Sequence, residues 1–373
     1  MKRETGFYSQ IGEISHFNPY PLPPLNPPLE ITESLLKLFG EAQGSLEKLN
    51  TIADRLPDKE RFIRAYVIKE ALLSSSIEGI HTTLIDVFTQ VLDEKQTSKE
   101  TELVLNYTKA LDAALNLITQ ENLPLTTRVL RTAHETLLTQ TSSKADPGNY
   151  RKQSVRVGNL IPPDAQKIPE LMSQLEHFIN AENSHQPLIK AGLAHVQFET
   201  IHPFLDGNGR IGRLLIVLML VESKLLSAPI IYPSFAFKKN ALEYYQKLDG
   251  VRRTGDFEGW IFFYLTAIKE SCEDAFRRIT EIEALENQLK QLITVDPLFY
   301  KMRDTAHKTL EFIFQKPVIS ITELSKNLGK SYNASKNILT RFEESGLIFK
   351  TEQKRNVRYQ FRPYLNLLEK EYN

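Results

Sequence analysis

The chain has 373 residues and a formal net charge of zero, with 46 basic side chains balanced by 46 acidic ones. This length is too great for a single hydrophobic core, so we expect two or three units. The single cysteine, Cys272, excludes an internal disulfide, the first residues lack the apolar stretch of a signal peptide, and the apolar run Leu214 to Val221 falls far short of the roughly 20 residues that span a bilayer. The composition therefore predicts a cytoplasmic protein with no membrane segment.

The first elements in chain order are a Pro-rich segment and a helix. Residues Asn18 to Pro28 contain many prolines, which predicts an extended run along the surface. Residues Arg61 to Ile77 have a helical pattern, and Gly79 is suited to cap the C-terminal end of that helix. Ser74 and Glu78 are four residues apart, so they are predicted to share one face of it.

The middle of the chain predicts a hairpin followed by a pair of helices. Residues 148–163 contain glycines and prolines around a short extended stretch, which indicates a hairpin and a loop before another helix. Residues 191–201 and 211–226 show neither strand-like alternation nor a β-rich composition, so both are predicted to be helical. An Asn-Gly pair between them is also a strong β-turn signal, but these helical flanks favour a helix, a loop and a second helix.

The loop between these two helices carries the sequence His-Pro-Phe-Leu-Asp-Gly-Asn-Gly-Arg-Ile-Gly-Arg at residues 202–213. Gly207 and Gly209 have no Cβ atom, so the turn that they form around Asn208 lets backbone amides approach an anion. A helix follows directly, and its N-terminal amides and dipole also favour negative charge. The segment therefore predicts a phosphate-binding site.

Charged and titratable side chains in the same segment extend this prediction. Arg210 and Arg213 are three residues apart, so both can hold phosphate oxygens from one side of the helix. Asp206 is a hard oxygen ligand that we expect to hold a Mg²⁺ ion bridging phosphates. His202 can be neutral near pH 7 and can accept a proton from an attacking hydroxyl. The residues together suit a nucleoside triphosphate with Mg²⁺.

A metal centre is the alternative to a phosphate site. His195, Glu199 and His202 stand at positions i, i+4 and i+7, with the Glu-x-x-His spacing of di-iron bundles. Such a centre needs a second Glu-x-x-His, and the other copy, Glu182 to His185, lies in a polar stretch. We therefore expect His195 to be a packed or hydrogen-bonded helix residue.

Residues 202–213 resemble the signature of Fic-domain proteins, His-x-Phe-x-Asp/Glu-Gly-Asn-Gly-Arg-x-x-Arg, at every constrained position. The resemblance implies a mainly α-helical Fic-type core and the transfer of AMP from ATP to a Tyr, Thr or Ser hydroxyl of a target protein, although some members transfer other phosphate-containing groups. It implies that His202 is the catalytic base and that Arg213 holds the γ-phosphate. It also assigns the remaining ATP-binding positions to Phe204, Asp206, Gly207, Asn208, Gly209 and Arg210. We expect Phe204 to anchor the loop in the core.

Residues 74–79, Ser-Ser-Ser-Ile-Glu-Gly, resemble the inhibitory motif of the same family, Ser/Thr-x-x-x-Glu-Gly/Asn. The resemblance implies that Glu78 pairs with Arg213 and so prevents ATP from binding productively, with Ser74 and Gly79 as the other motif positions. A homodimer is one candidate assembly, in which Glu78 acts within its own chain or on its neighbour.

Two further segments fit the resemblance. The predicted hairpin at residues 148–163 is similar in position to the family's flap, a hairpin that docks the target segment by strand addition. Asn240 and Tyr245 lie in segments similar to those near the nucleotide, and we expect them to contact the adenine or the ribose.

The C-terminal part differs in charge from the rest of the chain. Residues 301–363 carry seven more basic than acidic side chains, which favours a polyanionic partner or serves solubility. The long helical stretch from Trp260 to Ile293, charged and rich in leucine, is predicted to join this part to the preceding unit.

The pattern of residues 307–361 resembles a winged helix-turn-helix domain. It predicts helices at residues 307–314, 322–328 and 332–345, the second capped by Gly329, an extended stretch at 317–321, and a two-stranded wing at 346–350 and 357–361 joined by a charged turn at 352–356. On the third helix, the residues expected to face a nucleic-acid groove are Tyr332, Asn333, Ser335, Lys336 and Arg341, and those expected to face inward are Ala334, Ile338, Leu339 and Phe342. From the wing, we expect Lys354, Arg355 and Arg358 to reach phosphates. Winged helices also dock proteins, so DNA and protein partners both stay open for residues 301–373.

These patterns predict an N-terminal helical region at 1–110, a catalytic core at 111–270, a helical linker at 271–300 and a winged helix domain at 301–373. A competing hypothesis makes the chain a DNA-binding regulator that senses a nucleotide without transferring it. His202 favours catalysis, because nucleotide sensing alone does not need a base there.

Overall fold

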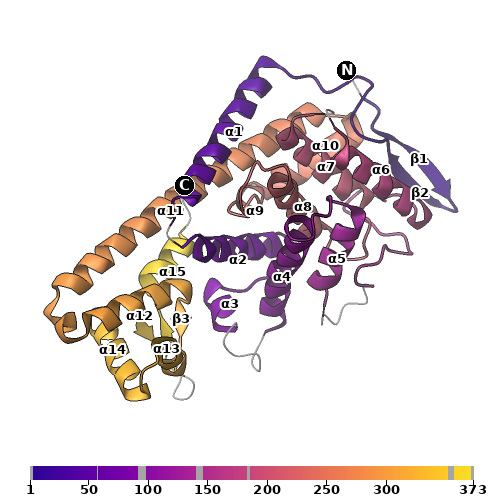
Figure 1. The fold of residues 1–373 in the computed structure, drawn as a ribbon. Helices are drawn as coiled ribbons and strands as arrows, with labels where there is room; N and C mark the ends of the chain where they lie inside the picture. Colours follow the sequence, from indigo (N-terminus) through magenta and orange to yellow (C-terminus); the bar gives the residue numbers. More distant parts are fainter. Residues whose placement is uncertain are drawn as a thin grey trace.

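The computed structural model describes residues 3–56, 58–90, 98–139, 146–182, 185–351 and 357–370. Within these ranges the chain is mainly helical, with two small antiparallel sheets (Figure 1). None of the helices so described is both long and apolar enough to cross a membrane. The mainly α fold expected from the sequence is confirmed.

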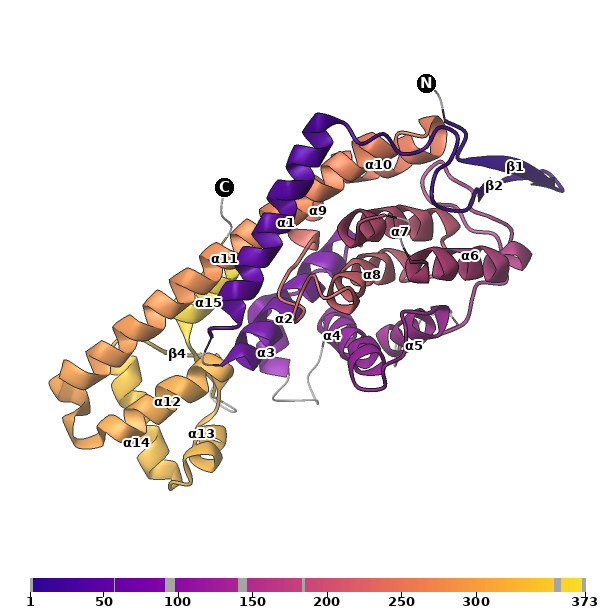
Figure 2. The ribbon, with the colours of Figure 1, turned by 45° about the horizontal axis from the view of Figure 1, so that its top comes forward.

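Two helices, α7 (Pro187–Ile201) and α8 (Asn208–Glu222), form the centre of the larger part of the molecule. Nearly every residue of both is buried, and a helix that is buried on all sides belongs to the interior of a protein. Figure 2 shows them surrounded by other helices. These are α2 (Lys59–Ile77), α4 (Lys99–Thr119), α5 (Thr127–Leu137), α6 (Ile168–Asn180), which follows the 3₁₀ turn η1 (Ala165–Lys167), α9 (Ser234–Lys239) and α10 (Ala241–Thr254).

The longest element is α11 (Phe257–Val295), whose 39 residues extend over about 58 Å at 1.5 Å per residue. It runs along the molecule in Figure 1, and α1 (Glu33–Ala53) packs against it. The predicted linker helix is thus present, and it starts earlier than position 271. The boundary expected at 110 likewise falls inside a continuous helix, α4.

The N-terminal residues form a hairpin that the sequence analysis did not predict. Strand β1 (Gly6–Ile11) pairs with β2 (Ile14–Pro19), and the backbone N–H of Phe17 donates to the carbonyl of Ile161 at 2.9 Å. Asn18 and Pro19, which were expected to begin an extended surface run, belong to β2 and are buried. The hairpin therefore packs against the loop that precedes α6.

The hairpin predicted at residues 148–163 is reduced to one isolated bridge between Val157 and Leu160. Its other backbone groups bond elsewhere: the N–H of Arg151 donates to the carbonyl of Pro203, and the carbonyl of Ile161 accepts from β2. Two prolines at the end of the segment have no N–H to offer a ladder. These contacts make the segment a loop that touches the predicted catalytic segment.

The C-terminal part combines helices with a three-stranded antiparallel sheet in the order β3-β5-β4. Its elements are η2 (Pro297–Met302), α12 (Arg303–Gln315), β3 (Val318–Ile319), α13 (Ile321–Leu328), α14 (Tyr332–Glu344), β4 (Phe349–Lys350), β5 (Tyr359–Gln360) and α15 (Arg362–Glu369). The predicted helices and strands are present within a few residues, and Ser320 and Glu323 form a capping box at the start of α13. Helix α15 was not predicted.

The exposed face of α14 differs from the expected one. Ser335 was predicted to face a groove and is fully buried, whereas Ala334 was predicted to face inward and is exposed. The buried stripe is Ser335, Ile338, Leu339 and Phe342, at positions i, i+3, i+4 and i+7, so residue 334 falls outside it. Tyr332, Asn333 and Lys336 are exposed as predicted, and Arg341 is half-buried.

The wing residues are also only partly as expected. Arg358 is largely buried and its Nη1 lies 3.5 Å from Oε2 of Glu323, so it pairs with the first turn of α13 and does not point freely into solvent. Lys354, Arg355 and the rest of the predicted charged turn lie outside the described residues.

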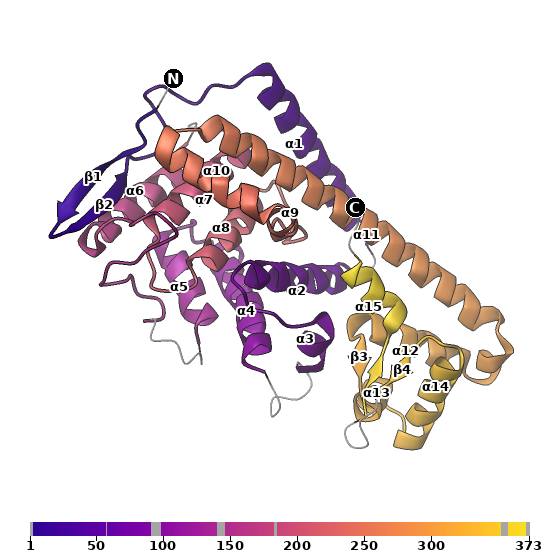
Figure 3. The same ribbon diagram turned by 180° about the vertical axis from the view of Figure 1, so that it is seen from behind.

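The C-terminal part is docked onto both α2 and α11. Lys69 of α2 donates through Nζ to the carbonyl of Leu368 at 3.0 Å, and Arg278 of α11 donates to the carbonyls of Leu367 and Lys370. Seen from behind in Figure 3, α15 lies between these two helices, and it also contacts α3 (Leu84–Gln90). The last helix of the chain therefore reaches the helix that carries the predicted inhibitory residues.

Candidate functional site

The candidate site is built around the N-terminus of α8. Helix α7 ends at His202, which is left-handed at φ 50°, and Gly207 precedes α8 in a left-handed conformation at φ 77°. Asn208 braces the loop between them, because its Oδ1 accepts from the N–H of Phe204 and its Nδ2 donates to the carbonyl of Phe204, both at 2.8 Å. Phe204 is fully buried and anchors the loop in the core as expected.

Two charged residues flank the free amides of α8. The Oδ1 atom of Asp206 accepts from the N–H of Gly207 at 2.6 Å and lies 3.4 Å from Nη2 of Arg210. The Asp206 side chain is 56% exposed, whereas that of Arg210 is only 4% exposed. Among the described residues, Nε and Nη1 of Arg210 have no hydrogen-bond partner. A buried guanidinium with unpaired donors at a helix N-terminus is suited to an anionic ligand.

Arg213 is held by the last turns of α2. Its Nη2 lies 2.8 Å from Oε1 of Glu78 and 2.9 Å from the carbonyl of Ser74, and its Nε donates to Oγ of Ser74 at 2.9 Å. Arg213 is 1% exposed, while the Glu78 side chain is about one-third exposed. The charge of Arg213 holds the pKa of Glu78 below its ordinary value although burial opposes this, so Glu78 is an anion at neutral pH.

The Glu78 carboxylate also lies directly over Gly209. A methyl group at position 209 would overlap Oε1 of Glu78 and lie 2.9 Å from Nη1 of Arg213. The positive charges of Arg210 and Arg213 both act on Glu78. An anion of the chain itself thus occupies the place that the α8 amides and the two guanidiniums prepare.

His202 is a neutral imidazole at the edge of this site. Burial and the neighbouring Arg252 and Arg151 guanidiniums lower its pKa to about 4. Its Nδ1 is buried and has no hydrogen-bond partner among the described residues. The side chain can therefore accept a proton at neutral pH.

Two residues that the sequence analysis missed position the loop between α7 and α8. His134 of α5 donates from Nε2 to the carbonyl of Asp206 at 3.0 Å, accepts at Nδ1 from the N–H of Gly148, and stacks on Phe204 with ring centroids 3.7 Å apart. Arg151 donates from Nε to the carbonyl of His202 at 2.9 Å. Both bind backbone carbonyls, which leave no residue-type signal in a single sequence.

Buried carboxyl groups surround Arg213 on its inner side. Burial raises the pKa of Glu70 and that of Glu199 to about 7 in each case, and the positive charge of Arg213 opposes both shifts. Glu70 accepts from Oγ of Ser234 at 2.5 Å and from Tyr107 at 3.3 Å, whereas Oε1 of Glu199 has no partner in the described part of the chain. The sequence analysis weighed Glu199 only as a metal ligand.

The other predicted residues lie at different distances from this centre. His195 is packed as expected, with Nδ1 donating to the carbonyl of Gly212 at 2.7 Å and Nε2 accepting from Tyr244 at 2.8 Å. Tyr245 is half-exposed, and partial burial together with the negative charge of Glu78 raises its pKa, so its ring lies on the side of Glu78. Asn240 donates to the carbonyl of Ala236 and lines a surface hollow between α10 and α11, and no contact with Glu78 or Arg213 is recorded for it in the described structure.

A Mg²⁺ ion would depend on Asp206. The described residues contain no cluster of three or more His, Cys, Asp or Glu side chains that could hold a metal, so the alternative metal centre at residues 195–202 has no support there. Both recorded contacts of the Asp206 carboxylate involve Oδ1, and the side chain is more than half exposed. Mg²⁺ commonly binds through one carboxylate together with substrate phosphates, so the group fits this residue.

Comparison with protein families identifies two matching segments. The Fic/DOC family matches residues 124–220, and the Fic/DOC family N-terminal segment matches residues 36–116. The first contains His202 to Arg213, and the second contains Ser74 to Gly79.

Curated relatives and solved structures agree with these matches. The chain is 29% identical over 261 residues to the protein adenylyltransferase Fic of Drosophila grimshawi, covering 63% of this chain and 52% of that protein, and 28% identical over 256 residues to that of Culex quinquefasciatus, covering 60% and 49%. It therefore spans about half the length of these relatives.

The structure of a Fic family protein from Desulfovibrio desulfuricans G20 is similar, with 25% identity and a TM-score of 0.57, covering 90% of this chain and 98% of that one. Fic-1 of C. elegans shares the fold at 20% identity and a TM-score of 0.52, covering 68% and 74%. The chain is thus similar to Fic proteins in two consecutive segments, at residues 36–116 and 124–220.

Proposed function

We propose that this protein transfers AMP from ATP to a Tyr, Thr or Ser hydroxyl of a target protein, and that Glu78 inhibits the transfer. The observation that carries the proposal is the buried guanidinium of Arg210, which has two unpaired donors beside the free amides of α8 and next to a neutral His202. The relatives named protein adenylyltransferase Fic support the same reaction class.

The proposed reaction breaks the bond between the α-phosphorus of ATP and the oxygen that bridges it to the β-phosphate. The backbone amides at the start of α8 and Arg210 bind the phosphate oxygens and stabilise the charge that develops during attack. Arg213 holds the γ-phosphate, which directs the leaving pyrophosphate away from the incoming hydroxyl. His202 takes the proton of that hydroxyl as the oxygen bonds to the α-phosphorus, and AMP remains on the target.

Asp206 is the residue that would hold Mg²⁺. When bound there, the ion would supply positive charge that neutralises the phosphates. His134 and Asn208 keep Asp206 and the adjacent amides in place through backbone hydrogen bonds.

Inhibition follows from competition for one guanidinium. Arg213 cannot bind a γ-phosphate while it is paired with Glu78, and the Glu78 oxygen also lies over the Gly209 backbone. Productive ATP binding therefore requires that Glu78 leave.

The decisive experiment compares the wild type with Glu78→Gly, Glu78→Gln and His202→Ala, using Mg²⁺, ATP labelled at the α-phosphate and cell lysate as a source of targets. We expect Glu78→Gly to raise protein labelling by about tenfold or more, because a charge-assisted pair no longer has to break. Glu78→Gln should also raise it, since the neutral amide pairs weakly with Arg213. His202→Ala in the Glu78→Gly background should lower labelling by at least about 100-fold, the usual range for loss of a general base.

The controls separate chemistry from folding and binding. The double variant should unfold at the same temperature as Glu78→Gly and bind ATP with a similar affinity. Labelling that survives without His202 would overturn its catalytic role. ATP binding without any labelling in Glu78→Gly would favour nucleotide sensing or a different donor.

For the C-terminal part, we propose a winged helix-turn-helix unit with DNA as a candidate partner. The order α12, β3, α13, α14, β4, β5 supports this unit, and Tyr332, Asn333 and Lys336 expose polar or basic groups on one side of α14. Binding of duplex DNA by the full chain should weaken steeply with added salt and should be reduced by Lys336→Ala. Unchanged binding in that variant would mean that α14 does not contact the DNA, and absence of binding to the wild type would favour a protein-docking module.

A further inference from the structure

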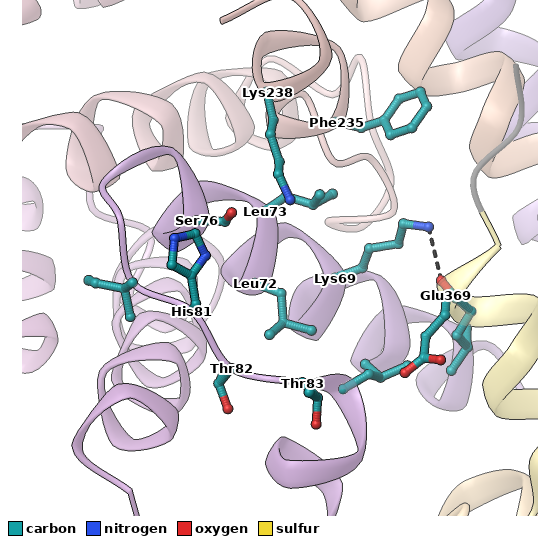
Figure 4. A pocket seen from close by; sticks show the side chains of 13 residues that line it. Lys69, Leu72, Leu73, Ser76, His81, Thr82, Thr83, Phe235, Lys238 and Glu369 are labelled. Carbon is teal, nitrogen blue, oxygen red and sulfur yellow. Dashed lines mark hydrogen bonds between the residues drawn. The ribbon is translucent and has the colours of Figure 1, made fainter.

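A separate cavity lies behind the inhibitory segment. It has a volume of about 300 Å³ and is enclosed by the last turns of α2, the segment at residues 80–83, the region around α9 and the end of α15. Figure 4 shows the side chains that line it, among them Leu72 and Ser76 of α2, Lys238 of α9 and Glu369 of α15. Its volume lies at the lower end of the range for small-molecule sites, and polar groups converge on an apolar surface, as in many such sites.

The lining combines an apolar floor with polar and positively charged groups. Leu72, Leu73 and Phe235 are half-buried and provide the floor. The exposed Lys238 contributes an ammonium group, and Ser76 and Thr82 contribute hydroxyls. His81 also lines the cavity, and the carboxylate of Glu369 lies toward α15, away from Lys238 (Figure 4). The end of the cavity at Lys238 therefore suits the phosphate or carboxylate head of an organic anion whose apolar body lies on the floor.

A hydrogen bond between α2 and α15 fixes one side of the cavity. Lys69 lines its side toward α15, and its Nζ donates to the carbonyl of Leu368 at 3.0 Å, as drawn in Figure 4. Lysine near a helix C-terminus satisfies a free carbonyl and favours the local dipole. The wall formed by α15 is thus fixed to α2.

The cavity and the inhibitory contact use opposite faces of α2. Lys69, Leu72, Leu73 and Ser76 stand at positions i, i+3, i+4 and i+7, which makes one stripe of a helix. Ser74, which holds Arg213, lies two residues before Ser76 and therefore points roughly 200° away from it at 100° per residue. The last turn of α2 thus has the cavity on one side and Arg213 on the other.

The inhibitory carboxylate follows directly from this turn. The N–H of Glu78 donates to the carbonyl of Ser75 at 3.0 Å and that of Gly79 to the carbonyl of Ser76 at 3.1 Å. A ligand that contacts Ser76 and the segment after it would stabilise these bonds. The backbone that places Glu78 on Arg213 is therefore part of the cavity wall.

We propose that the cavity binds a small organic anion, with its apolar part on Leu72, Leu73 and Phe235 and its anionic head beside Lys238, and that this ligand strengthens inhibition by Glu78. The regulatory half of the proposal rests on the proposed AMP transfer. Its direction follows from linkage: the cavity exists in the state in which Glu78 pairs with Arg213, so a ligand that fits this state stabilises it against the active one.

The binding half is tested on the full-length protein without turnover, with phenyl phosphate and phenylacetate as probes for the two head groups and benzyl alcohol as the uncharged control. Calorimetry should detect binding of at least one anion and weaker binding of benzyl alcohol. Lys238→Gln should weaken anion binding by at least about fivefold, since a charge-assisted hydrogen bond is lost. Lys239→Gln is the matched control, because this neighbouring exposed lysine does not line the cavity, and it should bind like the wild type.

Leu72→Trp provides an independent variant, because the larger side chain fills the cavity and should abolish binding. Hydrogen exchange of the Glu78 and Gly79 amides should slow when the anion binds. Absence of binding for both anions, or equal weakening by Lys238→Gln and Lys239→Gln, would overturn the site. Binding with unchanged exchange at these amides would overturn the coupling.

The effect on transfer is measured last, so that its failure is distinct from failure of the site. A saturating anion should lower basal AMP transfer of the wild type by about fivefold or more, the lower end of typical coupling between two sites, and leave that of Lys238→Gln unchanged. Equal inhibition of both proteins would mean that the probe competes at the phosphate site and would contradict the proposal. If Glu78→Gly shows no transfer at all, the proposed function fails while the calorimetry and the exchange data still decide the binding site.

Discussion

Burial shifts the pKa values of two residues at the end of α7, Glu199 and His202, in opposite directions. Burial raises the pKa of Glu199 to about 7 and lowers that of His202 to about 4. Near neutral pH the end of the helix therefore presents a partly protonated acid and a neutral base within one turn. Only the base borders the candidate phosphate site, where it can act on a hydroxyl.

The acid limb of the pH profile reports on His202. A base is active when deprotonated, so kcat/KM for AMP transfer by Glu78→Gly should be flat above about pH 5 and fall below it, because kcat/KM reflects the free enzyme. The negative charge of Glu78 raises the pKa of His202, so its loss in Glu78→Gly should lower that pKa further. The fall in kcat/KM should therefore stay at low pH. ATP binding by Glu78→Gly/His202→Ala over the same range controls for ionisation of ATP. A limb near pH 6.5 would show that His202 is not buried as described.

Glu199 should make stability depend on pH. Its pKa is about 7 in the folded chain and 4.5 ordinarily, so the folded state binds the proton more tightly and loses stability as pH rises from about 5 to 8. Glu199→Gln lacks this loss, so its free energy of unfolding relative to the wild type should rise by about 3 kcal/mol over that range, at 1.36 kcal/mol per pKa unit. Urea titrations of both proteins at the two pH values measure this. A constant difference would mean that Glu199 ionises freely.

At the scale of elements, the end of α2 binds Arg213 from one face through Ser74 and Glu78, and we call these contacts the clamp. Ser74 accepts from Nε of Arg213, while the neighbouring Ser75 is buried with no partner for its hydroxyl in the described chain. The two serines are adjacent in sequence, so they allow one contact of the clamp to be removed with a matched control.

Ser74→Ala should raise basal AMP transfer to a level between those of the wild type and Glu78→Gly. Hydrogen bonds to charged groups contribute about 1.5–3 kcal/mol, so we expect an increase of about tenfold if the bond matters mainly in the inhibited state. Ser75→Ala should leave transfer at the wild-type level. Equal rates for the two serine variants would indicate that Glu78 alone closes the clamp.

The sequence predicted those elements whose signals are local. The helices at residues 61–77 and 211–226 correspond to α2 and α8, and the segment 202–213 is contiguous, so its loop and helix N-terminus could be read directly. Helix α15 could not be predicted, because it is short, and isolated short helices are marginal in water. Its stability depends on carbonyl contacts from Lys69 and Arg278, which are distant in sequence.

Two residues of the site could not be predicted, because their partners are also distant in sequence. His134 and Arg151 act on backbone carbonyls of a loop 50 to 70 residues away, and neither contact depends on a local pattern. The burial of Ser335 was missed for another reason, since a small hydroxyl in an apolar stripe has the spacing of the core and the polarity of the surface. The ion pair between Glu78 and Arg213, by contrast, was predicted from the family motif.

Across the whole molecule, α11 is the element to which distant parts of the chain attach. Arg3 near the N-terminus pairs with Glu258 at 2.8 Å, Arg61 of α2 pairs with Glu286 at 2.7 Å, and Arg278 binds the end of α15. Arg278 is fully buried and lies 3.0 Å from Asp274. The docking of the C-terminal part therefore depends on a buried ion pair.

Arg278→Ala should lower the free energy of unfolding by about 3–5 kcal/mol, because it leaves the Asp274 carboxylate buried without its partner and two carbonyls of α15 unpaired. Chemical denaturation of the full chain measures the loss. Gln288→Ala, at an exposed position of the same helix, should change it by less than about 0.5 kcal/mol. Similar values for the two variants would show that α15 is held mainly by its apolar face.

Because Glu78 lies so close to Gly209, substitutions at these two positions have different consequences for the proposed inhibition. Any side chain at position 209 would displace the inhibitory carboxylate, but it would also fill the space that a phosphate needs, so release and inactivation come together. At position 78 the two effects are separable, because loss of the carboxylate leaves the anion site intact. Under the proposed inhibition, a single change at position 78 therefore releases the enzyme, whereas a change at position 209 of α8 does not.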